Sequence, residues 1–199
     1  MSTLTLTVDS AGFGGLFIAR HEGKVVMIKG PVLPGEIVEV SIDSERKDYI
    51  TASLLRVLAP SSRRTAPPCP YYGTCGGCQL QHAHHDQQIT LKQTVLGDCL
   101  RRIAGLDMAL SEPVTDNRQW NYRIRGQFKV SEGAIGLHKR GTRDVVTVGQ
   151  CLLMDREIND YIPRANRAIG KFRIREIHLT VGDALIGLII TRKGVFSSS

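Results

Sequence analysis

The sequence lacks the features that mark membrane and secreted proteins. No stretch approaches the roughly 20 consecutive apolar residues that a membrane span requires. The first residues, Met1 to Thr5, have neither the basic region nor the apolar run of a signal peptide. We therefore expect a cytoplasmic protein without membrane contact. In that compartment thiols stay reduced, so the five cysteines are better read as metal ligands or core residues than as disulfides.

Recognisable catalytic machinery is also absent. No predicted strand is followed by a G-x-G turn with an acidic residue downstream, which a nucleotide-like cofactor pocket would need. The glycines at positions 12, 14 and 15 belong instead to a β-rich region. The sequence therefore predicts no catalytic residue within these 199 positions.

Residues 1–62 are expected to fold as a small β barrel. Leu4, Leu6 and Val8 alternate with threonines, as a half-buried strand requires. Four more strands are predicted between glycine and proline turns, at 16–20, 24–28, 36–42 and 49–55. Five short strands in about 60 residues suit a barrel of the OB type.

The remaining residues divide into three predicted segments. Residues 63–85 are a linker and a cysteine-rich loop, and 86–112 are a helical segment that glycine at position 105 is placed to end. Residues 113–199 are predicted to be a β-rich domain with strands at 145–148, 177–181 and 185–190 and a short helix at 155–169. The expected fold is mainly β with some α: an OB-like five-stranded barrel followed by an α+β central domain with a metal-cluster loop.

Four of the five cysteines form a candidate metal site. Cys69, Cys75 and Cys78 have the spacing C-x5-C-x2-C, and three intervening glycines let the backbone wrap around a compact inorganic core. Cys151 follows a predicted strand and is the expected fourth ligand. An iron–sulfur cluster is favoured over zinc, because a four-cysteine zinc site usually has two C-x2–4-C hooks; free thiols are the third alternative. Cys99 lies on the apolar face of the predicted helix and is expected to be a core residue.

Basic residues concentrate after residue 62. The net charge is +7 and the pI about 9.4, whereas the first 62 residues hold slightly more acids than bases. This favours a polyanionic partner for the later segments, with ordinary solubility charge as the alternative. Between positions 118 and 143 cations alternate with aromatic rings, as phosphates and unpaired bases require. The candidate RNA contacts in this segment are Trp120, Tyr122, Arg123, Arg125, Lys139 and Arg140.

Other roles for some of these side chains stay open. For Trp120 and Tyr122, a core position in the sheet is as compatible with the sequence as stacking on a base. In the barrel, Phe13 and Phe17 flank the glycine-rich turn and are candidate base contacts, with Arg20 beside them. Three histidines after the cysteines, at positions 82, 84 and 85, are expected to cap the helix or face solvent.

These segments together resemble the TRAM-containing, iron–sulfur RNA 5-methyluridine methyltransferases. Residues 12–35 resemble the glycine-rich TRAM pattern, and residues 69–82 resemble the cluster signature nearly residue for residue. Residues 120–123 and 136–138 resemble the central domain, with Cys151 in the place of the last ligand. The resemblance implies a TRAM barrel that binds RNA, a central domain with a [4Fe–4S] cluster, and a C-terminal Rossmann-like domain, absent here, that binds S-adenosylmethionine.

The resemblance also implies a function. Members of this family of the 23S ribosomal RNA (uracil-C5) type add a catalytic cysteine to C6 of the uracil, so that C5 becomes nucleophilic and takes the methyl group. That cysteine lies beyond the end of this chain, which we read as the truncated N-terminal and central part of such an enzyme. The expected partners are RNA, ribosomal RNA first, and the missing methyltransferase domain. We predict that the chain alone transfers no methyl group.

Two alternatives come from other classes. One is a stand-alone RNA-binding module with a structural four-cysteine metal site and no catalysis. A longer reading frame encoding an S-adenosylmethionine pocket would decide for the enzyme. The other alternative is a radical-type tRNA-modifying enzyme with a TRAM domain. It is disfavoured because its spacing is C-x3-C-x2-C, and three cysteines leave one iron open.

Overall fold

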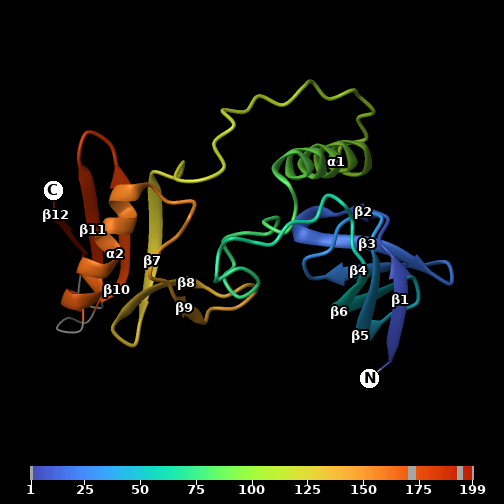
Figure 1. Ribbon diagram of the computed structural model, residues 1–199, viewed down its shortest axis with the longest axis horizontal. Helices are drawn as coiled ribbons and strands as arrows, with labels where there is room; N and C mark the ends of the chain where they lie inside the picture. The colour runs from blue at the N-terminus through green and yellow to red at the C-terminus, as the bar shows by residue number, and fades with distance from the viewer. Residues whose placement is uncertain (1, 170–173, 192–194, 199) are drawn as a thin grey trace. The chain divides into compact units, whose positions relative to one another are not determined.

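The computed structural model describes residues 2–169, 174–191 and 195–198, which form two units (Figure 1). We call them the barrel unit and the second unit. The barrel unit comprises Met1–Pro68 and Gln79–Val114, and the second unit comprises Cys69–Cys78 and Thr115–Ser199. The cysteine-rich loop thus groups with the second unit, and the helical segment after it groups with the barrel unit. No helix in the described ranges is long and apolar enough to cross a membrane.

The barrel unit is built on a six-stranded curled sheet (Figure 1). Its order is β1-β5-β6-β4-β3-β2, and only the β4–β6 pair is parallel among these neighbours. The five predicted strands are confirmed, and β2 is an additional strand too short to show an alternating pattern. The strands are β1 (Thr3–Thr7), β2 (Ser10–Ala11), β3 (Leu16–His21), β4 (Lys24–Lys29), β5 (Ile37–Glu45) and β6 (Tyr49–Ala59).

Alternating apolar side chains fill the interior of this sheet. Phe17, Val26, Ile28, Val40 and Ala52 are buried, as the period of two along their strands requires. Their removal from water is the main stabilising contribution to this unit. The predicted barrel core is therefore present.

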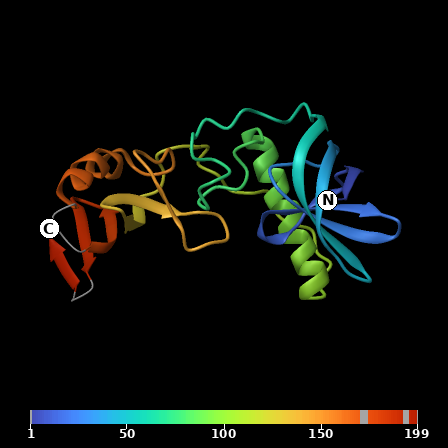
Figure 2. The same cartoon turned by 90° about the horizontal axis from the view of Figure 1, so that it is seen from below.

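One helix, α1 (His85–Ile103), packs on the barrel unit through Leu91 and Val95 (Figure 2). Gly105 ends it with a φ of 67°, and the Leu106 N–H donates to the Leu100 carbonyl oxygen at 3.0 Å. This is the glycine-terminated helix end that the sequence predicts. Residues 106–112, the end of the segment grouped with this helix, are non-helical, as a helix end at Gly105 predicts.

The second unit is a six-stranded antiparallel sheet with one helix on one face. The order is β12-β11-β10-β7-β8-β9, and the helix packs on β8 and β10 (Figure 2). The predicted helix and the strands near 145, 177 and 185 are confirmed. The elements are β7 (Arg125–Ser131), β8 (Ala134–His138), β9 (Val145–Thr147), α2 (Arg156–Ile169), β10 (Ile174–Val181), β11 (Leu185–Thr191) and β12 (Val195–Ser198).

The two faces of this second sheet differ in polarity. The face under α2 buries Phe128, Ile135 and Ile177 against the helix residues Ile158 and Ile162. Strand register places polar residues on the opposite face, where Lys129 pairs with Glu176 and Gln127 with His178. The sheet therefore has one apolar, covered face and one polar face.

Candidate metal centre and nucleic-acid interface

The cysteine loop leaves and re-enters the barrel unit through a short paired stem. The Thr65 N–H donates to the His82 carbonyl oxygen at 2.9 Å, and the His84 N–H donates to the Arg63 carbonyl oxygen at 2.9 Å. These two antiparallel hydrogen bonds hold the ends of the loop together. We call residues 63–65 and 82–84 the stem.

A buried carboxylate fastens the stem to the barrel. Glu36 is fully buried and accepts hydrogen bonds from Leu33 N at 2.8 Å, Ser61 N at 3.0 Å, and Arg64 Nε and a terminal nitrogen at 2.6 and 2.7 Å. Arg64 also donates to the Pro31 carbonyl oxygen at 2.6 Å. Burial by itself raises the pKa of Glu36, but the bonds from Arg64, Ser61 and Leu33 outweigh it and leave the pKa below its usual value.

A buried histidine completes this attachment. His82 is 1% exposed, its Nε2 is hydrogen-bonded with the Val32 carbonyl oxygen at 2.9 Å, and its ring meets Phe17 edge-on at 6.1 Å. The expectation that His82 caps the helix or faces solvent is therefore wrong. Phe17 is also 1% exposed, so its expected base contact is wrong too, because the ring lies in the core beneath the histidine.

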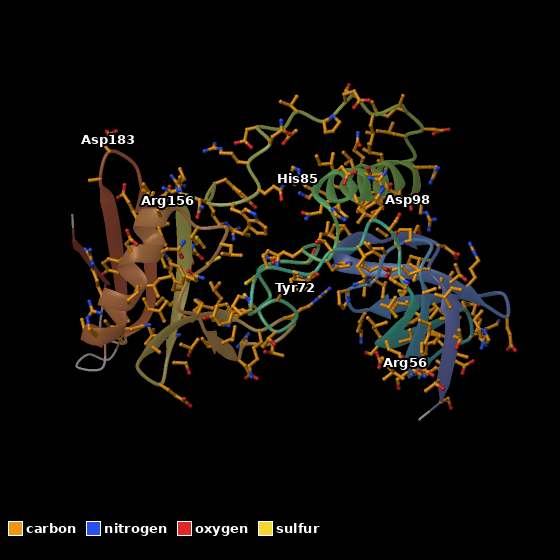
Figure 3. The ribbon with its side chains drawn as sticks, in the orientation of Figure 1. Arg56, Tyr72, His85, Asp98, Arg156 and Asp183 are labelled. Carbon is orange, nitrogen blue, oxygen red and sulfur yellow. The ribbon has the colours of Figure 1, made fainter. Side chains whose placement is uncertain are left out.

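The cysteine loop lies against the turn between β8 and β9. The Gly76 N–H donates to the His138 carbonyl oxygen at 2.9 Å, and the Arg140 N–H donates to the Thr74 carbonyl oxygen at 3.0 Å. A Cβ atom on Gly76 would lie 3.2 Å from that same His138 oxygen, so a side chain there would push the two segments apart. The loop, which Figure 3 marks at Tyr72, is thus braced on a turn that carries Lys139 and Arg140.

Cys151 is held just before α2 by side-chain hydrogen bonds. Asn159 accepts from the Cys151 N–H at 2.8 Å and donates to its carbonyl oxygen at 3.0 Å. The Tyr71 hydroxyl accepts from the Gly149 N–H at 2.9 Å, which joins the cysteine loop to the same segment. The fold therefore brings the segment of the distant Cys151 beside the cysteine loop.

The four thiols share a half-buried environment. Burial raises the pKa of Cys75, the Gly77 N–H at 3.4 Å from its Sγ opposes this, and the nearby Cys151 and Cys69 raise it further. No three His, Cys, Asp or Glu side chains among the described residues converge closely enough to hold a metal ion. By chemistry, four thiols are the donor type that zinc and iron–sulfur groups take, and Cys69 and Cys151 lie close enough to Cys75 to act on its pKa.

The predicted RNA contacts of the second unit lie beside this cysteine segment. The Asn121 and Arg123 N–H groups donate to the carbonyl oxygens of Leu152 and Leu153 at 2.9 and 2.8 Å, which aligns residues 121–123 with the chain after Cys151. Tyr122 is 45% exposed and so is not a core residue, whereas Trp120 is half-buried.

The cationic candidates are accessible. Arg123 and Arg125 are exposed, and so is Arg140. Lys139 is half-buried and pairs with Asp144 at 3.6 Å. This pair lies at the surface, where it costs little to exchange for a phosphate.

In the barrel unit, Phe13 and Arg20 are exposed, the former by 78%. Phe13 lies in the 3-10 turn Phe13–Gly15, beside an apolar groove of about 430 Å³ between this turn and α1. Cys99 is half-buried and lines that groove rather than lying in the core interior.

Residues 1–55 match the family model described as the TRAM domain. Residues 1–55 are a TRAM domain. The chain is 35% identical over 178 residues to an uncharacterized RNA methyltransferase of Aquifex aeolicus, a match that covers 88% of this chain and 42% of that protein. It is 36% identical over 187 residues to the 23S rRNA (uracil(1939)-C(5))-methyltransferase RlmD of Shewanella amazonensis, covering 89% of this chain and 42% of the relative.

The fold has a counterpart among solved structures. The tRNA (uracil-54, C5)-methyltransferase of Pyrococcus abyssi, solved in complex with S-adenosyl-L-homocysteine, matches with a TM-score of 0.65 and 19% identity over 96% of this chain and 46% of that one. The predicted resemblance to RNA uracil-C5 methyltransferases is therefore confirmed as homology. The TRAM domain spans less than half of the chain, and the chain spans about 42% of the curated relatives it matches.

Proposed function

We propose that the chain is the RNA-recognition and cysteine-centre part of an S-adenosylmethionine-dependent ribosomal RNA (uracil-C5) methyltransferase. The observation that carries this proposal is the 36% identity to a 23S rRNA uracil-C5 methyltransferase along 89% of the chain. The match includes the second unit as well as the TRAM domain, so the similarity is not that of one widespread module alone. Because the relatives modify ribosomal RNA, we place the protein in the cytoplasm.

Both units take part in the proposed RNA binding. In the TRAM domain, the exposed Phe13 supplies an aromatic face for a base and Arg20 a cation for a phosphate. In the second unit, Tyr122 supplies a second aromatic face, with Arg123 and Arg125 beside it. Lys139, Arg140 and the half-buried Trp120 complete the proposed set.

The same proposal assigns Cys69, Cys75, Cys78 and Cys151 as ligands of a [4Fe–4S] cluster. When bound, such a cluster supplies a rigid thiolate-held core with no open iron position, which suits a structural or RNA-positioning role. The Gly77 N–H already points at the Cys75 sulfur, the kind of hydrogen bond that tunes cluster potentials. Zinc held by the same thiolates is the alternative metal.

The chemical step belongs to the part of the relatives that this chain does not match. The S-adenosylmethionine pocket and the nucleophilic cysteine are placed there by the proposal. Cys99 is not promoted to that role, because it lines an apolar groove on α1. The 199-residue chain is therefore expected to bind RNA and to transfer no methyl group.

RNA binding and methyl transfer test this directly. We expect the purified chain to bind a ribosomal RNA hairpin in fluorescence anisotropy and to transfer no label from methyl-labelled S-adenosylmethionine. Absence of RNA binding would remove the RNA-recognition role. A gene that ends after Ser199 would favour the second candidate, a stand-alone RNA-binding module; a reading frame that continues into an S-adenosylmethionine pocket would favour the enzyme.

Metal analysis tests the cysteine assignment. We expect anaerobically purified protein to be coloured and to contain iron, and the Cys151→Ser variant to lose iron as fully as Cys75→Ser. Cys99→Ser is the matched control and should keep wild-type iron. A colourless protein with one bound zinc would overturn the iron–sulfur assignment, and full iron in Cys151→Ser would remove that residue from the ligand set.

A further inference from the structure

A cavity of about 670 Å³ opens on the second unit, and no cysteine is among its lining residues in the described part of the chain. Its walls come from β7, β8, β9, β10 and the β8–β9 turn, so it spans neighbouring strands of one sheet. The polar and charged residues that line it are Lys129, His138, Arg143, Arg175 and Glu176. Valine and isoleucine side chains form the rest of the wall.

Glu176, the one carboxylate among the described residues of the cavity wall, is already neutralised by its neighbours. Lys129 Nζ lies 2.6 Å from one oxygen of Glu176, and His178 Nε2 lies 3.1 Å from the other. These contacts, from Lys129 first and then from His178, hold the pKa of Glu176 below its usual value. Glu176 therefore stays ionised and paired, and it does little to cancel the other cations of the cavity.

Two arginines supply the uncompensated charge. Arg143 and Arg175 are exposed, and neither guanidinium has an ion-pair partner within the part of the chain that the structure describes. The turn that carries Arg143 is fixed, because its carbonyl oxygen is hydrogen-bonded with His138 Nδ1 at 3.1 Å. With Lys129 paired to Glu176, the cavity keeps a net positive charge from two planar, permanently charged groups.

We propose that this cavity seats a phosphodiester group of the RNA, with Arg143 and Arg175 as the cations that hold it. The inference rests on the proposed function for the identity of the partner as RNA. Guanidinium groups bind phosphate oxygens in bidentate pairs, and a site lined by strands of a rigid sheet holds them in place. The cavity is wide and its cations are exposed, which suits one phosphate of a continuous chain better than an enclosed free anion.

Variants of the whole 199-residue chain that replace an arginine by the uncharged glutamine test the proposal. Arg143→Gln and Arg175→Gln should each weaken binding of a ribosomal RNA hairpin about fivefold at physiological salt and reduce the slope of log affinity against log salt by roughly 1. Arg156→Gln on α2, which Figure 3 labels, removes the same charge from the face of the sheet that the helix covers. It should change affinity less than twofold, because Arg156 does not line the cavity and salt screens an exposed charge that makes no direct contact.

A direct readout separates contact from long-range charge. The Arg143 and Arg175 Nε–Hε signals in nuclear magnetic resonance should shift when RNA is added, while that of Arg156 stays in place. If wild-type protein binds no RNA, the proposed function fails with this inference. If wild-type protein binds but the two variants lose no more affinity than Arg156→Gln, the cavity is not the phosphate site and the proposed function stands. Equal shifts with inorganic phosphate alone, unaltered by RNA, would also overturn the assignment.

Discussion

The stem of the cysteine loop and the body of that loop are held by different chemistry. The stem is fastened by a fully buried carboxylate with an arginine partner, through Glu36 and Arg64. The body is fastened by neutral groups: the Tyr71 hydroxyl, and main-chain hydrogen bonds that join Gly76 and Thr74 to the β8–β9 turn. A buried charge is costly to expose or to leave unpaired, so the stem has one well-defined geometry. Neutral hydrogen bonds are each worth about 1 kcal/mol, so the loop body is the softer part.

This difference suits a loop that is proposed to close around an inorganic core. The ends of such a loop need a fixed separation, whereas its cysteines need freedom to move to coordination distance. Cys69, Cys75 and Cys78 are half-buried and lie in this softer part. The charged anchor lies in the barrel unit and depends on the TRAM fold.

Removal of the buried carboxylate charge should have the largest effect. Glu36→Gln leaves Arg64 without its partner and is expected to lower the free energy of unfolding of the barrel unit by about 3 kcal/mol. Hydrogen exchange of the β4, β5 and β6 amides at increasing urea concentration measures this free energy, because exchange reports the stability of each unit separately. Exchange protection in the second unit should fall much less.

The same substitution at an exposed ion pair is the control. Glu39 pairs with Arg56 at 2.8 Å, and the arginine side chain is 68% exposed. Glu39→Gln should cost less than about 1 kcal/mol, because solvent screens the pair. Equal losses in the two variants would show that burial of Glu36 does not set the strength of the anchor.

Acid should weaken the barrel unit through the same carboxylate. The pKa of Glu36 lies below its ordinary value of 4.5 in the folded protein, so the unfolded chain takes up a proton first. The stabilisation is present above pH 4.5 and is lost as the pH falls through the lower folded pKa. Urea titrations on both sides of pH 4.5 should show a steep loss in wild type and a shallower one in Glu36→Gln. Parallel curves for the two proteins would exclude this carboxylate as the source of the acid sensitivity.

The sequence predicts the strands of the barrel and the cysteine set but not this anchor. Glu36 follows a Pro-Gly turn and looks like a surface residue, and its partner Arg64 lies 28 positions away in a linker. Sequence periodicity reports local structure, so it cannot predict a salt bridge between two residues that lie so far apart in the chain. The burial of His82 was not predicted for the same reason. His82 stands among polar residues in the sequence, and only the fold places it over Phe17.

Glycines hid two strands of the second sheet. A Cβ atom on Gly126 would lie 2.6 Å from the Phe128 ring, and one on Gly136 would lie 2.4 Å from the Val146 carbonyl oxygen. Both positions need glycine for close packing inside a sheet, whereas in the sequence a glycine reads as a turn. Stretches with unbroken alternation, such as residues 177–181 of β10, were predictable because every second side chain indicates the face on which it lies.

Loss of the Asn159 side chain should give an intermediate effect in the second unit. Asn159→Ala removes the bonds to both main-chain groups of Cys151 and a third to the Met154 carbonyl oxygen at 3.1 Å. We expect the free energy of unfolding to fall by about 2 kcal/mol, because the Cys151 N–H loses its acceptor. Neither partner titrates, so hydrogen exchange should give the same loss on both sides of pH 4.5. A loss that grows in acid would mean that charge also fixes this segment.

The smallest expected effect comes from the Tyr71 hydroxyl, and it is the sharpest test of the soft loop. Tyr71→Phe keeps the ring and removes only the acceptor of the Gly149 N–H, an exposed bond of 2.9 Å. Water can replace that acceptor, so the loss should be about 0.5–1 kcal/mol in metal-free protein. If four thiolates bind a metal group, that group ties the loop to Cys151 independently of the hydroxyl. The variant should then be no less stable than wild type once loaded. Retention of the full loss in loaded protein would mean that the loop body is fixed by its hydrogen bonds and not by the metal.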